Sequence, residues 1–182
     1  YGTTDVTRTL SFSKQPEKIK NIFTKVLKGH IGVATYNLKK NTTGRHLDII
    51  ARNPLKKIGL DYAHGTGHGV GYFLNVHEGP QGISKYNTIK FKQGMILSNE
   101  PGYYQTNKFG IRIENLVYIK KIKNKLKFEN LTLAPIDKDL INFKLLSINE
   151  KKYLNEYHKK VYLKLCPYLN KKQKNWLKSF TI

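Results

Sequence analysis

The chain has 182 residues, which is enough for one domain with its own hydrophobic core. Its formal net charge of +21 comes almost entirely from lysine, because arginine occurs only at positions 8, 45, 52 and 112. Nucleic-acid readers rely on arginine for two-pronged base contacts, so we expect a solvated lysine surface rather than a nucleic-acid site. No apolar run is long enough to span a bilayer.

The ends and the cysteine content of the chain give two further expectations. The single cysteine, Cys166, excludes a disulfide within the chain and fits a reducing cytoplasm. The sequence starts at Tyr1 rather than at Met, inside a segment typical of the middle of a strand. We therefore expect the C-terminal piece of a longer protein.

The first predicted elements are a strand and two helices. Residues 5–12 alternate apolar and polar side chains, which predicts a strand. Residues 13–16 form a helix-start signal, and apolar residues then recur at helical spacing: Ile19, Ile22, Phe23, Val26, Leu27 and Ile31. A second helix is predicted from Thr42 onward, with Leu47, Ile50 and Ala51 buried. We expect it to fray at Pro54, which lacks a backbone donor.

Beyond Gly59 the pattern changes to glycine-rich turns and short runs typical of strands, at residues 72–76, 95–98, 109–122 and 126–133. A capping box at residues 147–150 then predicts a helix that ends at Pro167. Its apolar face is formed by Leu154, Tyr157, Val161 and Leu165. A short terminal helix containing Trp176 follows, and the order of helices and strands predicts an α+β fold.

Three histidines lie in one glycine-punctuated segment, residues 64–80. His64 and His68 are four residues apart, as in a helical metal motif, but the glycines around them disfavour a helix. In a strand the two side chains would share a face, and the glycines would let a metal, a substrate or a second backbone approach closely. The alternative is a glycine-rich turn with ordinary surface histidines. His77, expected at a strand end, fits a turn equally well.

Three carboxylates fall on predicted strands: Asp5, Glu100 and Glu114. A carboxylate that faces a core is unfavourable unless it is paired or bound to a metal. Carboxylates combined with histidine suit Mn²⁺ and tolerate Co²⁺ or Zn²⁺, so the sequence favours a metallohydrolase. The alternative for Glu114 is a salt bridge to Arg112 or to a lysine.

Four ordered motifs carry a resemblance to a known family: GTTDVTRT (2–9), HGTGHGVGYFLNVHEGP (64–80), SNEPGYY (98–104) and FGIRIEN (109–115). They resemble Xaa-Pro aminopeptidase (aminopeptidase P) of the pita-bread metallopeptidases. LTLAPID and the helix LNEYHKKV resemble the C-terminal end of its large, cytosolic-type form. The resemblance implies an α+β, pita-bread (creatinase/aminopeptidase-like) fold. Residues 1–135 would be the C-terminal part of the peptidase domain, and residues 136–182 a helical C-terminal extension.

The resemblance also implies a metal site made of Asp5, His68, Glu100 and Glu114. Asp5 and Glu114 would bridge two divalent metal ions, with Mn²⁺ expected first and Co²⁺ or Zn²⁺ as alternatives. The family's remaining aspartate would lie about seven residues before Tyr1. For that reason we expect the isolated chain to bind at most about one metal and to be inactive.

Residues that act on the substrate follow from the same resemblance. Glu100 would relay a proton, while His64 and His77 would orient the peptide and stabilise the tetrahedral intermediate. Arg112 and Tyr104 would contact the substrate or hold the ligand carboxylates. The implied reaction is release of the N-terminal residue from Xaa-Pro peptides by a metal-activated bridging hydroxide.

The implied partners are peptides with proline at the second position. We expect neither a nucleic-acid nor a membrane partner, and we expect the protein in the cytoplasm. A homodimer is possible. Two other functions remain as alternatives. One is an Xaa-Pro dipeptidase (prolidase), which cleaves only dipeptides. The other is a non-enzymatic pita-bread binding module, which the basic charge alone favours.

Overall fold

The computed structural model describes residues 2–182, and these form two units. The first unit contains the chain up to Arg8 together with Lys25–Thr132, and the second contains Thr9–Thr24 and Leu133–Ile182. All four carboxylate and histidine ligands expected at the metal site therefore belong to the first unit.

A three-stranded antiparallel sheet forms the centre of the first unit. Its order is β3 (Ile96–Asn99), β6 (Asn115–Ile122) and β7 (Lys125–Asn130). In the first pair Leu97 lies opposite Val117. A two-residue turn joins β6 to β7, and both its residues have positive φ, 46° at Lys123 and 62° at Asn124. This backbone is typical of the tight hairpin turns that match strand twist.

Two smaller strand pairs flank this sheet. β4 (Gly102–Gln105) pairs with β5 (Phe109–Arg112), and β1 (Gly67–His68) pairs with β2 (Gly82–Ile83), both antiparallel. A single bridge between Gly69 and Leu97 links the end of β1 to β3.

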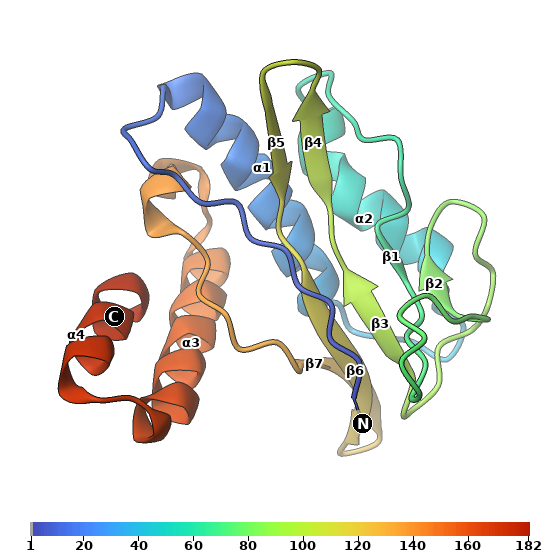
Figure 1. The fold of residues 1–182 in the computed structure, drawn as a ribbon. Coiled ribbons are helices and arrows are strands. Elements are labelled where there is room, and N and C mark those ends of the chain that lie inside the picture. Colours follow the sequence, from blue (N-terminus) through green and yellow to red (C-terminus); the bar gives the residue numbers. More distant parts are fainter. Residues whose placement is uncertain (1) are drawn as a thin grey trace. The chain divides into compact units, whose positions relative to one another are not determined.

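Two helices lie along one side of these strands, as Figure 1 shows: α1 (Glu17–Ala34), whose residues from Lys25 onward belong to this unit, and α2 (Gly44–Lys56). Their apolar faces and the inner face of the sheet form one buried cluster, made of Val33, Leu38, Leu47, Ala51, Ile83, Phe91, Leu97, Val117 and Ile119. Burial of each large aliphatic side chain contributes about 1.5–3 kcal/mol. The cluster therefore fixes the strand ends that carry the polar residues described below.

The second unit is mainly helical. α3 (Ile148–Leu165) begins with the predicted capping box, in which the Glu150 amide donates to Ser147 Oγ at 3.3 Å and the Ser147 amide donates to Glu150 Oε2 at 2.7 Å. Short 3₁₀ turns occur at Lys138–Leu140, Phe143–Leu145 and Cys166–Tyr168, and α4 (Lys171–Thr181) closes the chain. Buried His158 accepts a hydrogen bond from the Ile136 amide at 3.0 Å, which anchors α3 to the preceding segment.

Several sequence-based boundaries are wrong. Residues 5–12 are not a strand; in this segment the Glu114 amide donates to the Thr7 carbonyl. Residues 72–76 form bends rather than a strand, and His77 therefore ends no strand. The second helix continues to Lys56, two residues past Pro54. The predicted run 109–122 is divided into β5 and β6.

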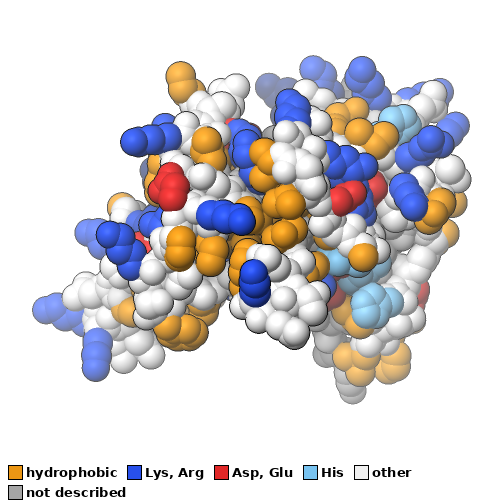
Figure 2. Space-filling view, turned by 90° about the horizontal axis from the view of Figure 1, so that it is seen from above, with side chains coloured by type: hydrophobic (Ala, Val, Ile, Leu, Met, Phe, Trp, Pro, Cys, Tyr) orange, Lys and Arg blue, Asp and Glu red, His pale blue; other side chains and the backbone are white. Residues whose placement is uncertain are grey.

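The surface shows the lysine content directly. On the face drawn in Figure 2, Lys and Arg side chains are spread among hydrophobic and uncharged ones rather than gathered into one continuous patch. Within residues 2–182, no helix combines the length and the apolar character needed to cross a membrane.

Candidate metal centre

Four separate segments of the first unit bring the predicted ligands together. His68 ends β1, Glu100 directly follows β3, Glu114 lies between β5 and β6, and Asp5 lies in the extended N-terminal segment. In that segment residues 3, 5 and 7 are shielded and residues 2, 4 and 6 are exposed. The predicted alternation of faces is therefore confirmed there, although no strand is formed.

Two backbone contacts hold these segments in place. The Glu100 amide donates to the Thr66 carbonyl at 2.8 Å, and the Glu114 amide donates to the Thr7 carbonyl at 3.1 Å. A Cβ atom at position 67 would overlap the Ser98 carbonyl, so only glycine lets β1 lie this close to β3. At Gly67 the close neighbour is a second backbone, as one of the expected alternatives has it.

The side chains meet at His68. Its Nε2 atom lies 3.2 Å from Asp5 Oδ2 and 3.2 Å from Glu100 Oε1. On the other side of the ring, Nδ1 lies 3.0 Å from the Gly69 carbonyl. Metal-binding histidines commonly donate from one ring nitrogen to a carbonyl and bind the metal through the other. In His68 the Nδ1 atom is placed for the first role and Nε2 for the second.

Glu114 completes the group. Ligand atoms of His68, Glu100 and Glu114 lie within 4.8 Å of one another. The Thr7 hydroxyl donates to Glu114 Oε2, and the Arg8 guanidinium donates to the Glu114 carbonyl at 2.6 Å. Arg112 Nη1 lies 3.7 Å from Glu100 Oε2.

The electrostatics of the group favour a bound cation. Burial raises the pKa of Glu114 to about 6, and the nearby charges of Glu100 and Asp5 add to this effect. Burial opposes a charge on His68, but its hydrogen bonds to Glu100 and to the Gly69 carbonyl and the charge of Asp5 raise its pKa to about 9. Two buried carboxylates, Glu100 and Glu114, and the half-buried Asp5 thus repel one another and hold a proton on His68, so the donor set fits a divalent cation.

Metal binding at this site is expected to release protons. Because ligands must be deprotonated to bind, Mn²⁺ at pH 7 should displace about one proton from His68, whose pKa is about 9. Near pH 5 Glu114, with a pKa of about 6, is also protonated, so the number should approach two and the affinity should fall. Calorimetric titration in buffers with different ionisation enthalpies measures this number. Binding with no proton release at pH 7 would contradict the arrangement.

A chain of hydrogen bonds lies beside the ligands. Arg112 Nε donates to the Tyr104 hydroxyl at 2.7 Å, and that hydroxyl lies 2.9 Å from His64 Nε2. His64 Nδ1 in turn lies 2.7 Å from the Gly65 carbonyl. Burial lowers the pKa of His64, which favours a neutral imidazole near pH 7. The predicted substrate residues Arg112, Tyr104 and His64 are therefore brought together.

His77 lies next to the ligand group as well. Its ring centroid is 4.3 Å from that of His68, in an edge-to-face arrangement. Ligand atoms of Asp5, His68 and His77 lie within 4.8 Å of one another, so geometry alone would allow His77 to bind a metal rather than a substrate. His64, His68, His77, Glu100 and Arg112 line one hollow of about 310 Å³.

The two histidines can be separated by metal content. We expect His68→Ala to lose tightly bound metal, because His68 belongs to both sets of neighbouring ligand atoms, the one with Asp5 and the one with Glu100 and Glu114. His77→Ala is expected to retain metal and to lose turnover, since its expected partner is the substrate. Elemental analysis of the two purified variants beside the unsubstituted protein decides this. A metal-free His77→Ala and a fully loaded His68→Ala would reverse the assignment.

A buried polar network, not predicted from the sequence, supports the histidine segment. Arg52 donates to the carbonyls of Tyr62 and His64 and, through Nε, to Asp48 at 2.8 Å. The other Asp48 oxygen accepts from Thr66 Oγ1 at 2.7 Å. A signal was present: Asp48 and Arg52 are four residues apart on α2, and Asp48 lies among its buried residues.

Comparison with known proteins gives two matches to one family. Metallopeptidase family M24 matches residues 1–121, and the C-terminal region of peptidase M24 matches residues 124–181. Xaa-Pro aminopeptidase 1 of Dictyostelium discoideum is 44% identical over 191 residues, which are 98% of this chain and 30% of that protein. The chain thus spans less than a third of the length of this relative.

Solved structures agree. An X-prolyl aminopeptidase from Caenorhabditis elegans, described as a cytosolic enzyme with a di-nuclear active site, matches 100% of this chain and 31% of its own, with a TM-score of 0.93 and 39% identity. A prolidase from Pyrococcus furiosus matches 71% of this chain and 36% of its own, with a TM-score of 0.62 and 34% identity. The expected α+β pita-bread fold is confirmed by these matches.

Proposed function

We propose, from the premise that this chain belongs to metallopeptidase family M24, that the whole protein is a metallo-aminopeptidase that releases the N-terminal residue from Xaa-Pro peptides. One observation carries the proposal. The acidic group around His68 and the chain of hydrogen bonds from Arg112 through Tyr104 to His64 are joined by the 3.7 Å approach of Arg112 to Glu100. We infer from this contact that a metal-binding group and a substrate-orienting group share one site.

The proposed metal ligands are Asp5, His68, Glu100 and Glu114, with Asp5 and Glu114 shared between two divalent ions. We propose Mn²⁺, which suits a site rich in carboxylate oxygen. Bound divalent ions supply Lewis acidity and a water activated near neutral pH. The raised pKa values of Glu114 and His68 support such a cation.

The remaining residues act on the peptide. Arg112 and Tyr104 form the hydrogen-bond chain that fixes the ring of His64, which lines the hollow. His64 and His77 would orient the peptide carbonyl and stabilise the charge that develops on its oxygen. Glu100 Oε2, the oxygen that faces Arg112 rather than His68, would take up the proton released during attack and pass it to the leaving nitrogen.

The wider assignments are proposals of the same kind. We place the boundary between the peptidase domain and the helical extension at residues 135–136. The enzyme would act in the cytoplasm on peptides with proline second, without a nucleic-acid or membrane partner. This agrees with the relative from Caenorhabditis elegans, which is described as cytosolic.

The experiment compares a tripeptide with a dipeptide. The whole protein, chelated and then supplied with Mn²⁺, is incubated with Arg-Pro-Pro and with Gly-Pro, and the products are identified by mass spectrometry. Release of free arginine supports the aminopeptidase. Cleavage of Gly-Pro alone would favour a prolidase. The chain is also similar to the prolidase from Pyrococcus furiosus. Cleavage of neither, with tight binding to histones or nucleic acid, would favour a binding module.

A further inference from the structure

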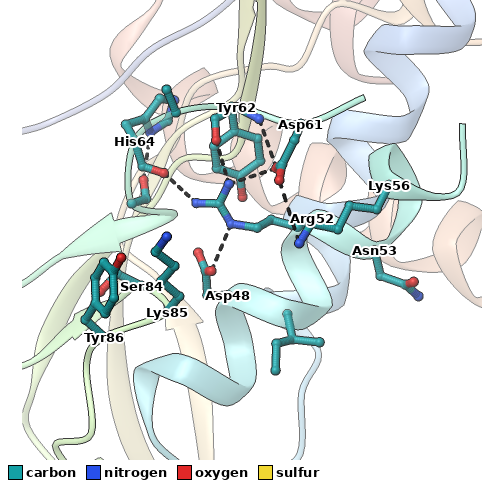
Figure 3. A pocket seen from close by; sticks show the side chains of 13 residues that line it. Asp48, Arg52, Asn53, Lys56, Asp61, Tyr62, His64, Ser84, Lys85 and Tyr86 are labelled. Atoms are coloured by element: carbon teal, nitrogen blue, oxygen red, sulfur yellow. Dashed lines mark hydrogen bonds and ion pairs between the residues drawn. The ribbon is translucent and has the colours of Figure 1, made fainter. Parts of the chain in front are cut away.

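A second hollow adjoins the one over the candidate metal centre. Its volume is about 430 Å³, and it shares His64 and Gly65 with the first hollow. Figure 3 shows it between helix α2, which carries Arg52, and the segment that carries Ser84 and Lys85. His64 and Gly65 line both hollows, so the second hollow is a neighbour of the first.

Most charges around this second hollow are paired. Arg52 Nε lies 2.8 Å from Asp48, and Arg52 Nη1 lies 2.8 Å from Asp61. Lys56 lies 3.7 Å from the other oxygen of Asp61. These three ion pairs lie within the protein. The charges of Arg52, Lys56, Asp48 and Asp61 therefore attract a ligand only weakly.

Lys85 is the exception. In Figure 3 its side chain extends into the hollow, toward the Arg52 guanidinium. Among residues 2–182 no carboxylate lies within 4 Å of its ammonium group, whose recorded contact is the ring of Tyr86 at 4.6 Å. The lining therefore has three cations against two carboxylates, and Lys85 holds the uncompensated charge.

The rest of the lining identifies the kind of anion. Ile49 and Tyr86 offer exposed apolar surface, and Asn53 offers an amide. This mixture suits a stretch of peptide with one negative charge better than a phosphate, which is normally bound by several donors at once. The free carboxylate at the C-terminal end of an oligopeptide has this chemistry.

We infer that the second hollow is a subsite for the tail of the peptide substrate, in which Lys85 binds the terminal carboxylate. The inference rests on the proposed function, which places the amino end of the peptide at the metal centre. A dipeptide has its carboxylate on the proline next to the scissile bond, so that carboxylate stays in the first hollow. The subsite therefore favours oligopeptides with a free C-terminus over dipeptides and over amidated peptides.

The experiment uses the whole, metal-loaded protein and peptides Arg-Pro-(Gly)n, with n from one to five, each as free acid and as C-terminal amide. At the length that reaches Lys85, the amide is expected to have a KM about fivefold higher than the acid, as for an exposed ion pair. The kcat values should agree within about twofold, because the contact is remote from the reacting bond. Lys85→Gln should abolish the difference between acid and amide. Lys121→Gln, which removes an exposed lysine from β6 outside this hollow, should retain it.

The possible failures are distinct. If the peptides are cleaved but acid and amide have equal KM at every length, or Lys85→Gln leaves the difference intact, the inference is overturned and the proposed function stands. If no peptide is cleaved, the proposed function fails. Calorimetric binding of the same acid and amide pairs then decides the inference: a preference for the acid that Lys85→Gln removes supports it, and equal binding overturns it.

Discussion

Glu100→Gln is expected to lower kcat for an Xaa-Pro tripeptide by roughly 10²–10⁴-fold, the range typical of a lost acid–base group. The glutamine keeps the shape of the side chain but loses the negative charge that approaches His68 at 3.2 Å and Arg112 at 3.7 Å. It also loses the oxygen proposed to take up a proton. Steady-state rates at saturating tripeptide and Mn²⁺ measure the effect.

The matched control is Glu156→Gln. Glu156 lies on α3, its side chain is 68% exposed, and its ion pair with Lys152 is 4.0 Å long, so its loss should leave kcat within about twofold. A Glu100→Gln protein that retains more than a tenth of the activity would exclude Glu100 from the reaction.

Arg52→Met is expected to lower the free energy of unfolding by about 3–5 kcal/mol, because it leaves a buried carboxylate without its cation. The Arg52 side chain is 12% exposed and that of Asp48 only 3%. The substitution also removes the donors to the carbonyls of Tyr62 and His64, so the histidine segment loses its anchor to α2. Chemical denaturation measures the change.

Arg45→Met is the control for this prediction, because Arg45 lies on the same helix with an exposed side chain. Its effect should stay within about 0.5 kcal/mol. A double variant, Asp48→Asn with Arg52→Met, should recover part of the loss, since no unpaired charge remains. A change below about 1 kcal/mol for Arg52→Met alone would show that the network contributes little.

The helices were predictable from the sequence, while the shortest strands were not. Helical spacing identified α1 through residues such as Phe23 and Leu27, which are buried. Strands β1 and β2 have two residues each, too few for any alternation to be visible. Residues 72–76 look β-forming by composition, but Phe73 is exposed and Leu74 has a φ of 61°, so the segment turns instead.

Motif resemblance named the residues that meet at the candidate site, but not the contacts that support them. Motif resemblance selected His64, His68 and Glu100, and the fold brings them to one hollow. His77 could bind either a metal or the substrate because its ring lies close to that of His68. The spacing of the histidines in the sequence does not predict this distance. Lys85 lies in a lysine-rich stretch, and the sequence does not set it apart. Among the described residues that line the second hollow, Arg52 and Lys56 are paired with carboxylates and Lys85 is not.

The most direct test of a metal-dependent aminopeptidase at this site is the release of free arginine from Arg-Pro-Pro, followed in one sample of the whole protein through chelation and metal return. We predict that release stops when the metal is removed and is restored when Mn²⁺ is added back. Release that continues undiminished in metal-free protein, or that never occurs with Mn²⁺ bound, would contradict the proposed function.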